Sequence, residues 1–101
     1  MMNPNPLSST TVCVRKLKVL ADPTRLAVLQ MLMEGPLHVS ELSDRLGVEQ
    51  SLLSHHLKVL RQTGLAIALR DGKAVLYSLA PGVKPDAKNA LNLGCCLLSF
   101  D

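Results

Sequence analysis

The segment from Ser51 to Lys58 constrains the fold of this chain more than any other part of its sequence. It reads Ser-Leu-Leu-Ser-His-His-Leu-Lys. Apolar residues recur within it and just after it at the helical spacing i, i+4, i+7, at Leu53, Leu57 and Leu60. Polar residues fall on the other side, at Ser51, Ser54, His55 and Lys58. We therefore predict a helix from about Gln50 to Gly64, buried on one side and free to contact another molecule on the other.

A second amphipathic segment precedes this helix, from Val39 to Leu46, and it ends at Gly47. Because glycine commonly follows a helix end, the two helices are expected to meet across a tight turn. Two helices joined in this way form a helix-turn-helix, which lays its second helix in the major groove of DNA. The sequence therefore predicts double-stranded DNA as the partner of the exposed side.

The net charge of +3 is concentrated around the same helix. Residues 1–49 carry five basic and five acidic side chains, and residues 74–101 carry two of each. Between Gln50 and Lys73, four basic side chains are accompanied by one acid, Asp71. A local basic field attracts phosphate groups, which supply the sequence-independent part of DNA affinity. The candidate DNA-binding residues are Gln50, Ser51, Ser54, His55, Lys58, Arg61, Arg70 and Lys73.

Two further helices are predicted nearer the N-terminus. The first is expected from about Val12 to Leu20. The dipeptide Asp22-Pro23 is typical of an N-cap and first turn, so a second helix begins there and ends at Gly35-Pro36. Residues 1–11 carry Asn, Pro, Ser and Thr with little to bury, and we expect them to form a mobile N-terminal arm.

The C-terminal third is predicted to contain a hairpin and a last helix. Two short apolar runs flank Asp71-Gly72, a dipeptide that favours a tight two-residue turn. After breaks at Pro81, Gly82 and Pro85, the residues from Asp86 to about Leu98 are expected to be helical. The expected fold is thus mainly α with a β-hairpin, in the order four helices, a hairpin and one helix, within one domain that spans residues 12–101.

Length and composition limit the class of protein. At 101 residues the chain is one domain of a size at which a partner subunit commonly adds buried surface, so a homodimer is expected. Its apolar stretches are shorter than the roughly 18 residues needed to span a bilayer, and its start lacks the order of a signal peptide. We expect a cytoplasmic protein without a membrane partner, whose Cys13, Cys95 and Cys96 remain thiols.

Several motifs follow one another along the chain: Asp22-Pro23-Thr24-Arg25-Leu26, Val39-Ser40-Glu41-Leu42, Leu46-Gly47-Val48, Ser54-His55-His56-Leu57-Lys58-Val59-Leu60, Gly64-Leu65 and Arg70-Asp71-Gly72-Lys73. Together they resemble the ArsR/SmtB family of bacterial metal- and metalloid-responsive repressors. The resemblance covers about residues 12–98, which is nearly the whole chain, and so many motifs in order make it specific.

The resemblance implies a dimeric winged helix-turn-helix protein whose first and last helices form the dimer interface. Such proteins bind an inverted-repeat operator when they are free of ligand and leave it when an inducer binds. By position, Ser51, Ser54, His55 and Lys58 match the family's recognition helix, and Arg70 and Lys73 match its wing.

The chain departs from the family at two known types of sensing site. Relatives with a thiolate site in the third helix carry cysteine after Glu-Leu, whereas here Glu41-Leu42 is followed by Ser43. Other relatives bind zinc through histidines and carboxylates of the last helix. In this chain that segment holds no acid except Asp86 before the terminal aspartate, and no histidine follows His56. The sequence predicts that both sites are absent.

The three cysteines remain as candidate ligands. A single free cysteine most often serves as a small apolar side chain, but two adjacent thiols carry a risk of oxidation for little gain in packing. Thiolates select soft ions, and As(III) or Sb(III) takes three sulfurs in a pyramid. We therefore predict a repressor released by arsenite or antimonite, with Cd(II) or Pb(II) less favoured, through Cys95, Cys96 and Cys13. Whether Cys13 is a ligand, and from which subunit, stays open.

Two other readings of the cysteines compete with this one. A redox or persulfide sensor would pair Cys13 with Cys95 or Cys96 and keep the DNA-binding surface. A thiol enzyme or metal carrier is disfavoured, because the sequence has no general base near any cysteine and no C-x-x-C motif. Of the histidines outside the DNA-binding set, His56 is expected to pack or cap rather than bind metal, and His38 to be an ordinary exposed residue.

Overall fold

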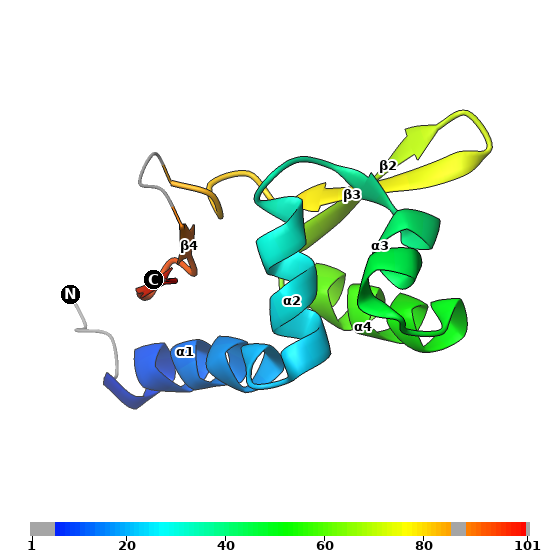
Figure 1. Cartoon of the computed structure of the whole chain (residues 1–101). Helices are drawn as coiled ribbons and strands as arrows, with labels where there is room; N and C mark the ends of the chain where they lie inside the picture. The colour runs from blue at the N-terminus through cyan, green and yellow to red at the C-terminus, as the bar shows by residue number, and fades with distance from the viewer. Residues whose placement is uncertain (1–5, 86–88, 101) are drawn as a thin grey trace.

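Figure 1 shows the computed structural model of the chain, which describes residues 6–85 and 89–100. Its helices are α1 (Pro6–Leu20), α2 (Pro23–Leu32), α3 (Val39–Leu46) and α4 (Gln50–Gln62). Its strands are β1 (Leu37–His38), β2 (Ala66–Asp71), β3 (Ala74–Leu79), β4 (Ala90–Asn92) and β5 (Leu97–Ser99). Helices α3 and α4 form the predicted helix-turn-helix, and β2 with β3 forms the wing. The predicted winged helix-turn-helix class is therefore confirmed.

Leucine side chains from α2, α4 and the sheet make the core. The three leucines predicted to be buried on α4 have no exposed surface, and the same is true of Leu29 on α2 and Leu42 on α3. Burying one such side chain stabilises a fold by about 1.5–3 kcal/mol. The apolar side of α4 therefore fixes the rotation of this helix about its axis, and its polar side must face outward.

The turn between α3 and α4 has a clear local cause. Gly47 adopts a left-handed conformation with φ of 64°, and its N–H donates to the carbonyl of Ser43. The hydroxyl of Ser43 donates to the carbonyl of Val48 at 2.6 Å. Because glycine has no Cβ, it takes this conformation without steric cost and ends α3 where the sequence predicts.

The two strands of the wing belong to a three-stranded antiparallel sheet in the order β1-β3-β2. In it Asp71 pairs with Ala74, so the two-residue turn consists of Gly72 and Lys73 rather than the predicted Asp71-Gly72. Gly72 has φ of 62°, which suits the first position of a hairpin turn. The short strand β1, which the sequence analysis did not predict, pairs with β3 through Leu37 and His38.

The structure corrects one predicted boundary and one predicted element. Helix α1 begins at Pro6 rather than at about Val12, so residues 6–11 of the expected arm are helical, while residues 1–5 of that arm lie outside the described part of the chain. The expected last helix is wrong. Strands β4 and β5 form an antiparallel hairpin instead, and residues 86–88 of the predicted helix lie outside the described part.

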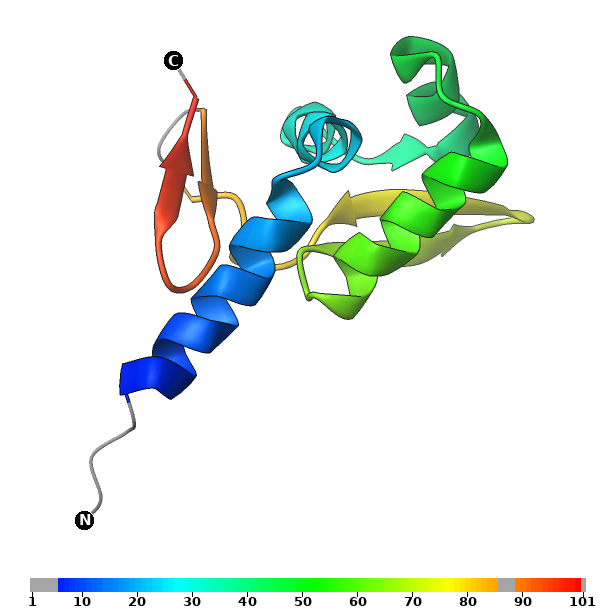
Figure 2. The same cartoon turned by 90° about the horizontal axis from the view of Figure 1, so that it is seen from below.

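The hairpin forms because its turn has its own hydrogen bonds. The Asn92 side chain accepts from the N–H of Gly94 at 2.8 Å, and Gly94 has φ of 87°, which a helix does not contain. The N–H of Leu93 donates to the carbonyl of Cys96 at 2.9 Å and closes the turn. Figure 2 shows the hairpin beside α1, on the side of the molecule away from the wing.

Candidate nucleic-acid interface and sulfur cluster

The eight candidate DNA-binding side chains are all exposed. Six of them lie on α4, and their exposure follows from the burial of the leucines on the other side of that helix. The other two lie at the end of the wing, Arg70 on β2 and Lys73 in the turn. The fold therefore places the whole predicted set on the recognition helix and the wing.

A groove of about 650 Å³ runs between α4 and the wing sheet. Ser54, Lys58 and Arg61 line it from α4, and Tyr77 lines it from β3. Lys58 and Arg61 carry two of the chain's basic groups into this groove, and Tyr77 adds a hydroxyl. The groove thus joins the polar side of the recognition helix to the wing in one basic surface.

Ser51 differs from the other candidates because a neighbour already occupies its hydroxyl. Its Oγ donates to the carboxylate of Glu49 at 2.9 Å, at the N-terminal end of α4. A DNA phosphate or base would have to compete with this carboxylate for the hydroxyl. We therefore rank Ser54 and His55 above Ser51 as side chains that contact base edges.

His38 connects α3 to the wing, and the prediction that it is an ordinary exposed residue is wrong. It is the residue that precedes α3, and its N–H donates to the carboxylate of Glu41 at 3.0 Å. Its ring Nδ1 donates to the carbonyl of Val75 on β3 at 3.1 Å, and its Nε2 lies 3.3 Å from Asp71. The spacing of His38 in the sequence gave no sign of these contacts, because Asp71 and Val75 are distant in the chain.

His56 lies between α4 and α2 and is half-buried. Its Nδ1 is 3.2 Å from Nη1 of Arg25, whose Nε donates to the carbonyl of Val19 at 2.7 Å. The N–H of Arg25 in turn donates to the carboxylate of Asp22, the N-cap of α2. This hydrogen bond, together with the nearby Arg25 and His56 side chains, lowers the pKa of Asp22, although partial burial opposes the effect. The predicted packing role of His56 agrees with these contacts.

The sulfurs of Cys13, Cys95 and Cys96 all lie within 4.8 Å of one another. Cys13 comes from α1, and the other two come from the turn of the β4–β5 hairpin, although Cys13 and Cys95 are 82 residues apart in sequence. One chain therefore supplies all three sulfurs. Cys13 and Cys96 are half-buried and Cys95 is exposed, so the cluster lies at the surface.

Cys13 and Cys95 form a disulfide with their Cα atoms 5.8 Å apart, and the Cys96 sulfur lies 3.9 Å from that of Cys95. The expectation that all three cysteines are thiols is therefore wrong for this state of the protein, in which Cys96 is the free thiol. A span of this length suits a disulfide bond. The same convergence of α1 and the turn allows the three sulfurs to act together once the bond is reduced.

A run of hydrogen bonds between backbone groups leads from the turn that carries the cysteines to α4. The N–H groups of Asn92, Val83, Ala80 and Leu65 donate in succession to the carbonyls of Val83, Ala80, Leu65 and Leu60, and Leu93 bonds to Cys96 at the other end. Leu65 and Val83 are buried along this path. The hairpin is thus joined to the end of the recognition helix through main-chain atoms.

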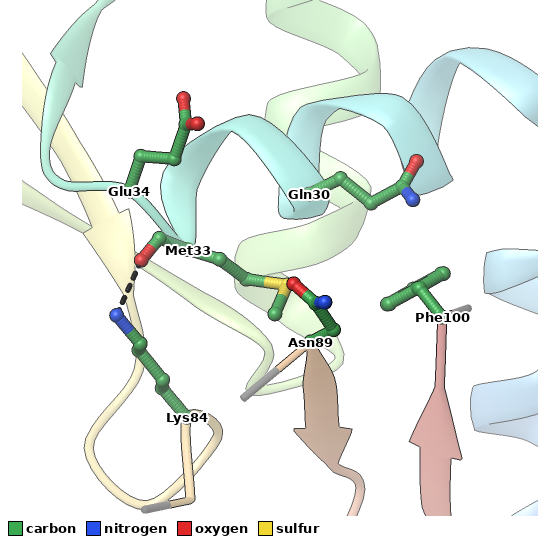
Figure 3. Close-up of a pocket in the computed structure, with 6 residues that line it drawn as sticks. All are labelled: Gln30, Met33, Glu34, Lys84, Asn89 and Phe100. Atoms are coloured by element: carbon green, nitrogen blue, oxygen red, sulfur yellow. Dashed lines mark hydrogen bonds between the residues drawn. The ribbon is translucent and has the colours of Figure 1, made fainter. Parts of the chain in front are cut away.

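A separate hollow of about 330 Å³ lies between the end of α2 and the hairpin (Figure 3). Its lining is Gln30, Met33, Glu34, Lys84, Asn89 and Phe100. Lys84 does not point freely into this hollow, because its Nζ donates to the carbonyl of Met33 at 2.6 Å. This lining has one acid, one base and no histidine or thiol, so it does not resemble a site for a soft metal ion.

The helices in the described ranges are too short or too polar to cross a membrane.

Comparison with known proteins places this geometry in a family. Residues 22–68 match the family model described as "Bacterial regulatory protein, arsR family". The HTH-type transcriptional regulator NmtR of Mycobacterium tuberculosis is 48% identical over 63 residues, which are 62% of this chain and 52% of that protein. The chain spans about half the length of the curated relatives it matches.

Solved structures extend the likeness to most of the fold. The reduced form of HlyU from Vibrio cholerae is 40% identical, with a TM-score of 0.69, over 72% of this chain and 77% of that one. The homodimeric winged helix-turn-helix DNA-binding domain Mb0332 of Mycobacterium bovis, titled a possible ArsR-family transcriptional regulator, is 27% identical. Its TM-score is 0.70 over 79% of this chain and 76% of that one. From the matched helix-turn-helix, the wing and these likenesses, the chain belongs to the ArsR family of bacterial regulatory proteins.

Proposed function

We propose that this protein is a transcriptional repressor that binds an inverted-repeat operator as a homodimer and releases it when a soft metalloid or metal ion binds its three cysteines. The single observation that carries the proposal is the convergence of the three sulfurs within 4.8 Å on a chain that also exposes a basic recognition helix and wing. Relatives named as transcriptional regulators favour DNA binding over an enzyme or a metal carrier. Its place of action would be the cytoplasm, where bacterial promoter DNA lies.

DNA binding would use the basic surface formed by α4 and the wing. Ser54 and His55 would meet base edges in the major groove, since both stand on the outward side of α4. Lys58, Arg61, Arg70 and Lys73 would meet phosphates, because their charges lie in the groove beside α4 and at the end of the wing. Phosphate contacts set position and strength, whereas base contacts set sequence preference.

The homodimer would form through α1. Val14 and Leu17 are 40% and 43% exposed on this helix, and the helical spacing places them on the same side of it as Leu7. This replaces the expected interface of first and last helices, because the last helix is a hairpin here. A two-fold dimer would present two recognition helices to half-sites roughly 34 Å apart.

The sulfur cluster would be the sensing site, and its donor set fits the proposed inducer. Three sulfurs suit As(III) or Sb(III), and they suit Cd(II) or Pb(II) less specifically. The Cys13–Cys95 bond must first gain two electrons and two protons from a cellular thiol reductant, which yields two thiols beside Cys96. When bound, the ion would supply bonds that join Cys13 on α1 to the turn of the hairpin.

The hydrogen bonds between the turn and α4 suggest how sensing reaches the DNA. A change in the position of the turn relative to α1 would act on the proposed dimer helix at one end and on Leu65 and α4 at the other. Two recognition helices must fit two half-sites at a fixed spacing, so a small rotation of either helix weakens binding to both. This account requires that α1 and α4 both respond to the same change in the position of the turn.

The test is a titration of arsenite into the reduced protein bound to its own promoter fragment, followed by fluorescence anisotropy. We expect complete release at one As(III) per subunit. Cd(II) and Pb(II), titrated separately, test the less favoured inducers. Failure of all three ions to release the reduced protein from DNA would refute the proposed sensing function while leaving the DNA-binding function standing.

A second candidate function follows from the Cys13–Cys95 disulfide itself. Oxidation by hydrogen peroxide would convert two thiols and one peroxide into the disulfide and two waters. A small persulfide would form the same disulfide and would be reduced to its thiol and hydrogen sulfide. The similar protein HlyU is known in a form described as reduced, which favours a redox function for the cysteines of this chain. If peroxide releases the DNA and arsenite under anaerobic reducing conditions does not, the redox function is the correct one.

A further inference from the structure

Lys16 bonds α1 to the turn that carries two of the cysteines. Its Nζ donates to the carbonyl of Leu93 at 2.7 Å, and a Cβ built on Gly94 would lie 3.4 Å from the same Nζ. Lys16 is half-buried and stands one helical turn after Cys13 on α1. The ammonium group thus lies against the backbone immediately before Cys95.

The position of this bond matters because the disulfide cannot hold the cluster together in the reduced state. With Cys13 and Cys95 as thiols, the covalent link between α1 and the turn is lost. Among the residues that the structure describes, Lys16 is the charged side chain with a hydrogen bond to that turn. The described part of the hairpin, residues 89–100, carries no charged side chain that could replace it.

We propose that Lys16 is a positioning residue for the sulfur cluster, which holds Cys13 within reach of Cys95 and Cys96 after reduction. This inference rests on the proposed sensing function and names a residue that the cysteine pattern alone does not reveal. Lys16 touches none of the sulfurs in this role. It acts through Leu93 by keeping the turn in register with α1, which raises the effective concentration of Cys13 at the turn.

The two other basic residues of α1 provide a contrast. Arg15 and Lys18 are exposed, and neither has a hydrogen bond to the hairpin among the contacts of the described residues. Lys18→Met is therefore a matched control, because it removes the same group from the same helix without removing the bond to Leu93. Lys16→Arg is the conservative variant, because its guanidinium keeps donors that reach the same carbonyl.

The deciding experiment measures how readily Cys13 pairs with the turn in the full-length protein. Wild type, Lys16→Met, Lys16→Arg and Lys18→Met are equilibrated with reduced and oxidised glutathione, and peptide mass spectrometry gives the fraction of Cys13 linked to Cys95 or Cys96. We expect the equilibrium constant for the link to fall about three- to tenfold in Lys16→Met, as loss of one hydrogen bond predicts. Lys16→Arg should recover most of it, and Lys18→Met should match wild type.

Circular dichroism checks that each variant keeps its helices, and Lys16→Ala, which also lacks a donor, replaces Lys16→Met if the latter unfolds. An equilibrium constant in Lys16→Met equal to that of wild type, or an equal fall in Lys18→Met, would overturn the role of Lys16.

A second measurement connects the inference to the inducer. X-ray absorption on the arsenite complex should count three sulfurs in wild type, and competition with a dithiol should show that Lys16→Met binds arsenite about three- to tenfold more weakly, in step with the glutathione equilibrium. An arsenite affinity in Lys16→Met equal to that of wild type would contradict the positioning role. If wild type takes up no arsenite, the proposed inducer fails, whereas the glutathione equilibrium still decides whether Lys16 positions the cysteines.

Discussion

The imidazole of His38 lies 3.3 Å from the carboxylate of Asp71, so the residue that precedes α3 contacts the last residue of β2. The same ring donates to the carbonyl of Val75, which pairs with Arg70 across the wing. His38 therefore links the helix-turn-helix to the part of the wing that presents Arg70 and Lys73.

From this link we predict that His38→Ala weakens operator binding although His38 does not contact DNA in the proposed complex. Loss of the hydrogen bond to Val75 should lower the free energy of unfolding by about 1 kcal/mol and leave the wing less firmly held. Urea unfolding and fluorescence anisotropy on operator DNA measure the two effects. His55→Ala is the control, since it should weaken DNA binding with unchanged stability. Unchanged affinity in His38→Ala would contradict the link.

The basic surface predicts a strong dependence of operator affinity on salt. Four basic residues per subunit lie between Gln50 and Lys73, and each neutralised phosphate contributes about 0.9 to the logarithmic slope, so a slope of roughly 4 to 7 is expected for the dimer. Arg70→Ala and Lys73→Ala should each weaken binding to all sequences alike and reduce that slope.

Ser54→Ala and His55→Ala should instead cost about 1–3 kcal/mol on the operator and relax the preference at single base positions. Anisotropy titrations at several salt concentrations measure both patterns. A slope near zero would show that this basic surface does not bind DNA.

The sulfur cluster predicts variants that bind the operator but are not released from it by arsenite. Cys95→Ser and Cys96→Ser should each bind the operator as wild type does and fail to leave it with arsenite, because a serine hydroxyl is a harder donor that stays protonated near neutral pH. Cys13→Ser should behave in the same way if it is the third ligand, whereas a two-sulfur site would leave weakened induction. Gel-shift assays with increasing arsenite provide the measurement. A normal arsenite response in the Cys95→Ser/Cys96→Ser double variant would disprove the site.

The exposed apolar side of α1 predicts that Val14→Glu and Leu17→Glu weaken the homodimer. A charge placed in an apolar interface loses its water shell without gaining a partner. The dissociation constant of the dimer should therefore rise at least tenfold, which corresponds to about 1.4 kcal/mol. Leu69→Glu is the matched control, because it makes the same substitution at a leucine that is similarly exposed, at 45%, but lies on the wing. Sedimentation equilibrium distinguishes monomer from dimer. If Leu17→Glu stays as dimeric as Leu69→Glu, another surface forms the dimer.

Asp22 predicts how stability depends on acid pH. Since its folded-state pKa lies below the ordinary value, the ionised carboxylate stabilises the folded state above that value. This contribution disappears as the pH falls through the lowered pKa, that is, below about pH 4. Asp22→Ala, which removes the N-cap of α2, should cost about 1 kcal/mol near neutral pH and less in acid. Thermal unfolding of both proteins between pH 2 and pH 7 measures the difference, and a constant difference across this range would contradict the assignment.

The sequence alone was sufficient to predict those features that depend on short-range patterns. The spacing of Leu53, Leu57 and Leu60 predicted both the existence of α4 and its buried side, because helix periodicity and burial are properties of a few neighbouring residues. The exposed positions of the six candidate DNA-binding residues on α4 followed from that burial, and those of Arg70 and Lys73 followed from their place at the predicted hairpin turn. Gly47 likewise predicted the end of α3, since its left-handed conformation has a local steric cause.

The tertiary structure decided what depends on distant partners. One error was local instead: the segment with Leu91, Cys95 and Leu98 fits a helical stripe, yet the turn at Asn92 and Gly94 makes it a hairpin, because turn chemistry outweighed periodicity there. The contacts of His38 with the wing and the meeting of Cys13 with the turn join residues far apart in the chain. Periodicity carries no information about such pairs, because their approach depends on how packed elements turn relative to one another. The sequence thus determined the recognition helix, whereas the packing of α1 against the hairpin decided where the sulfurs meet.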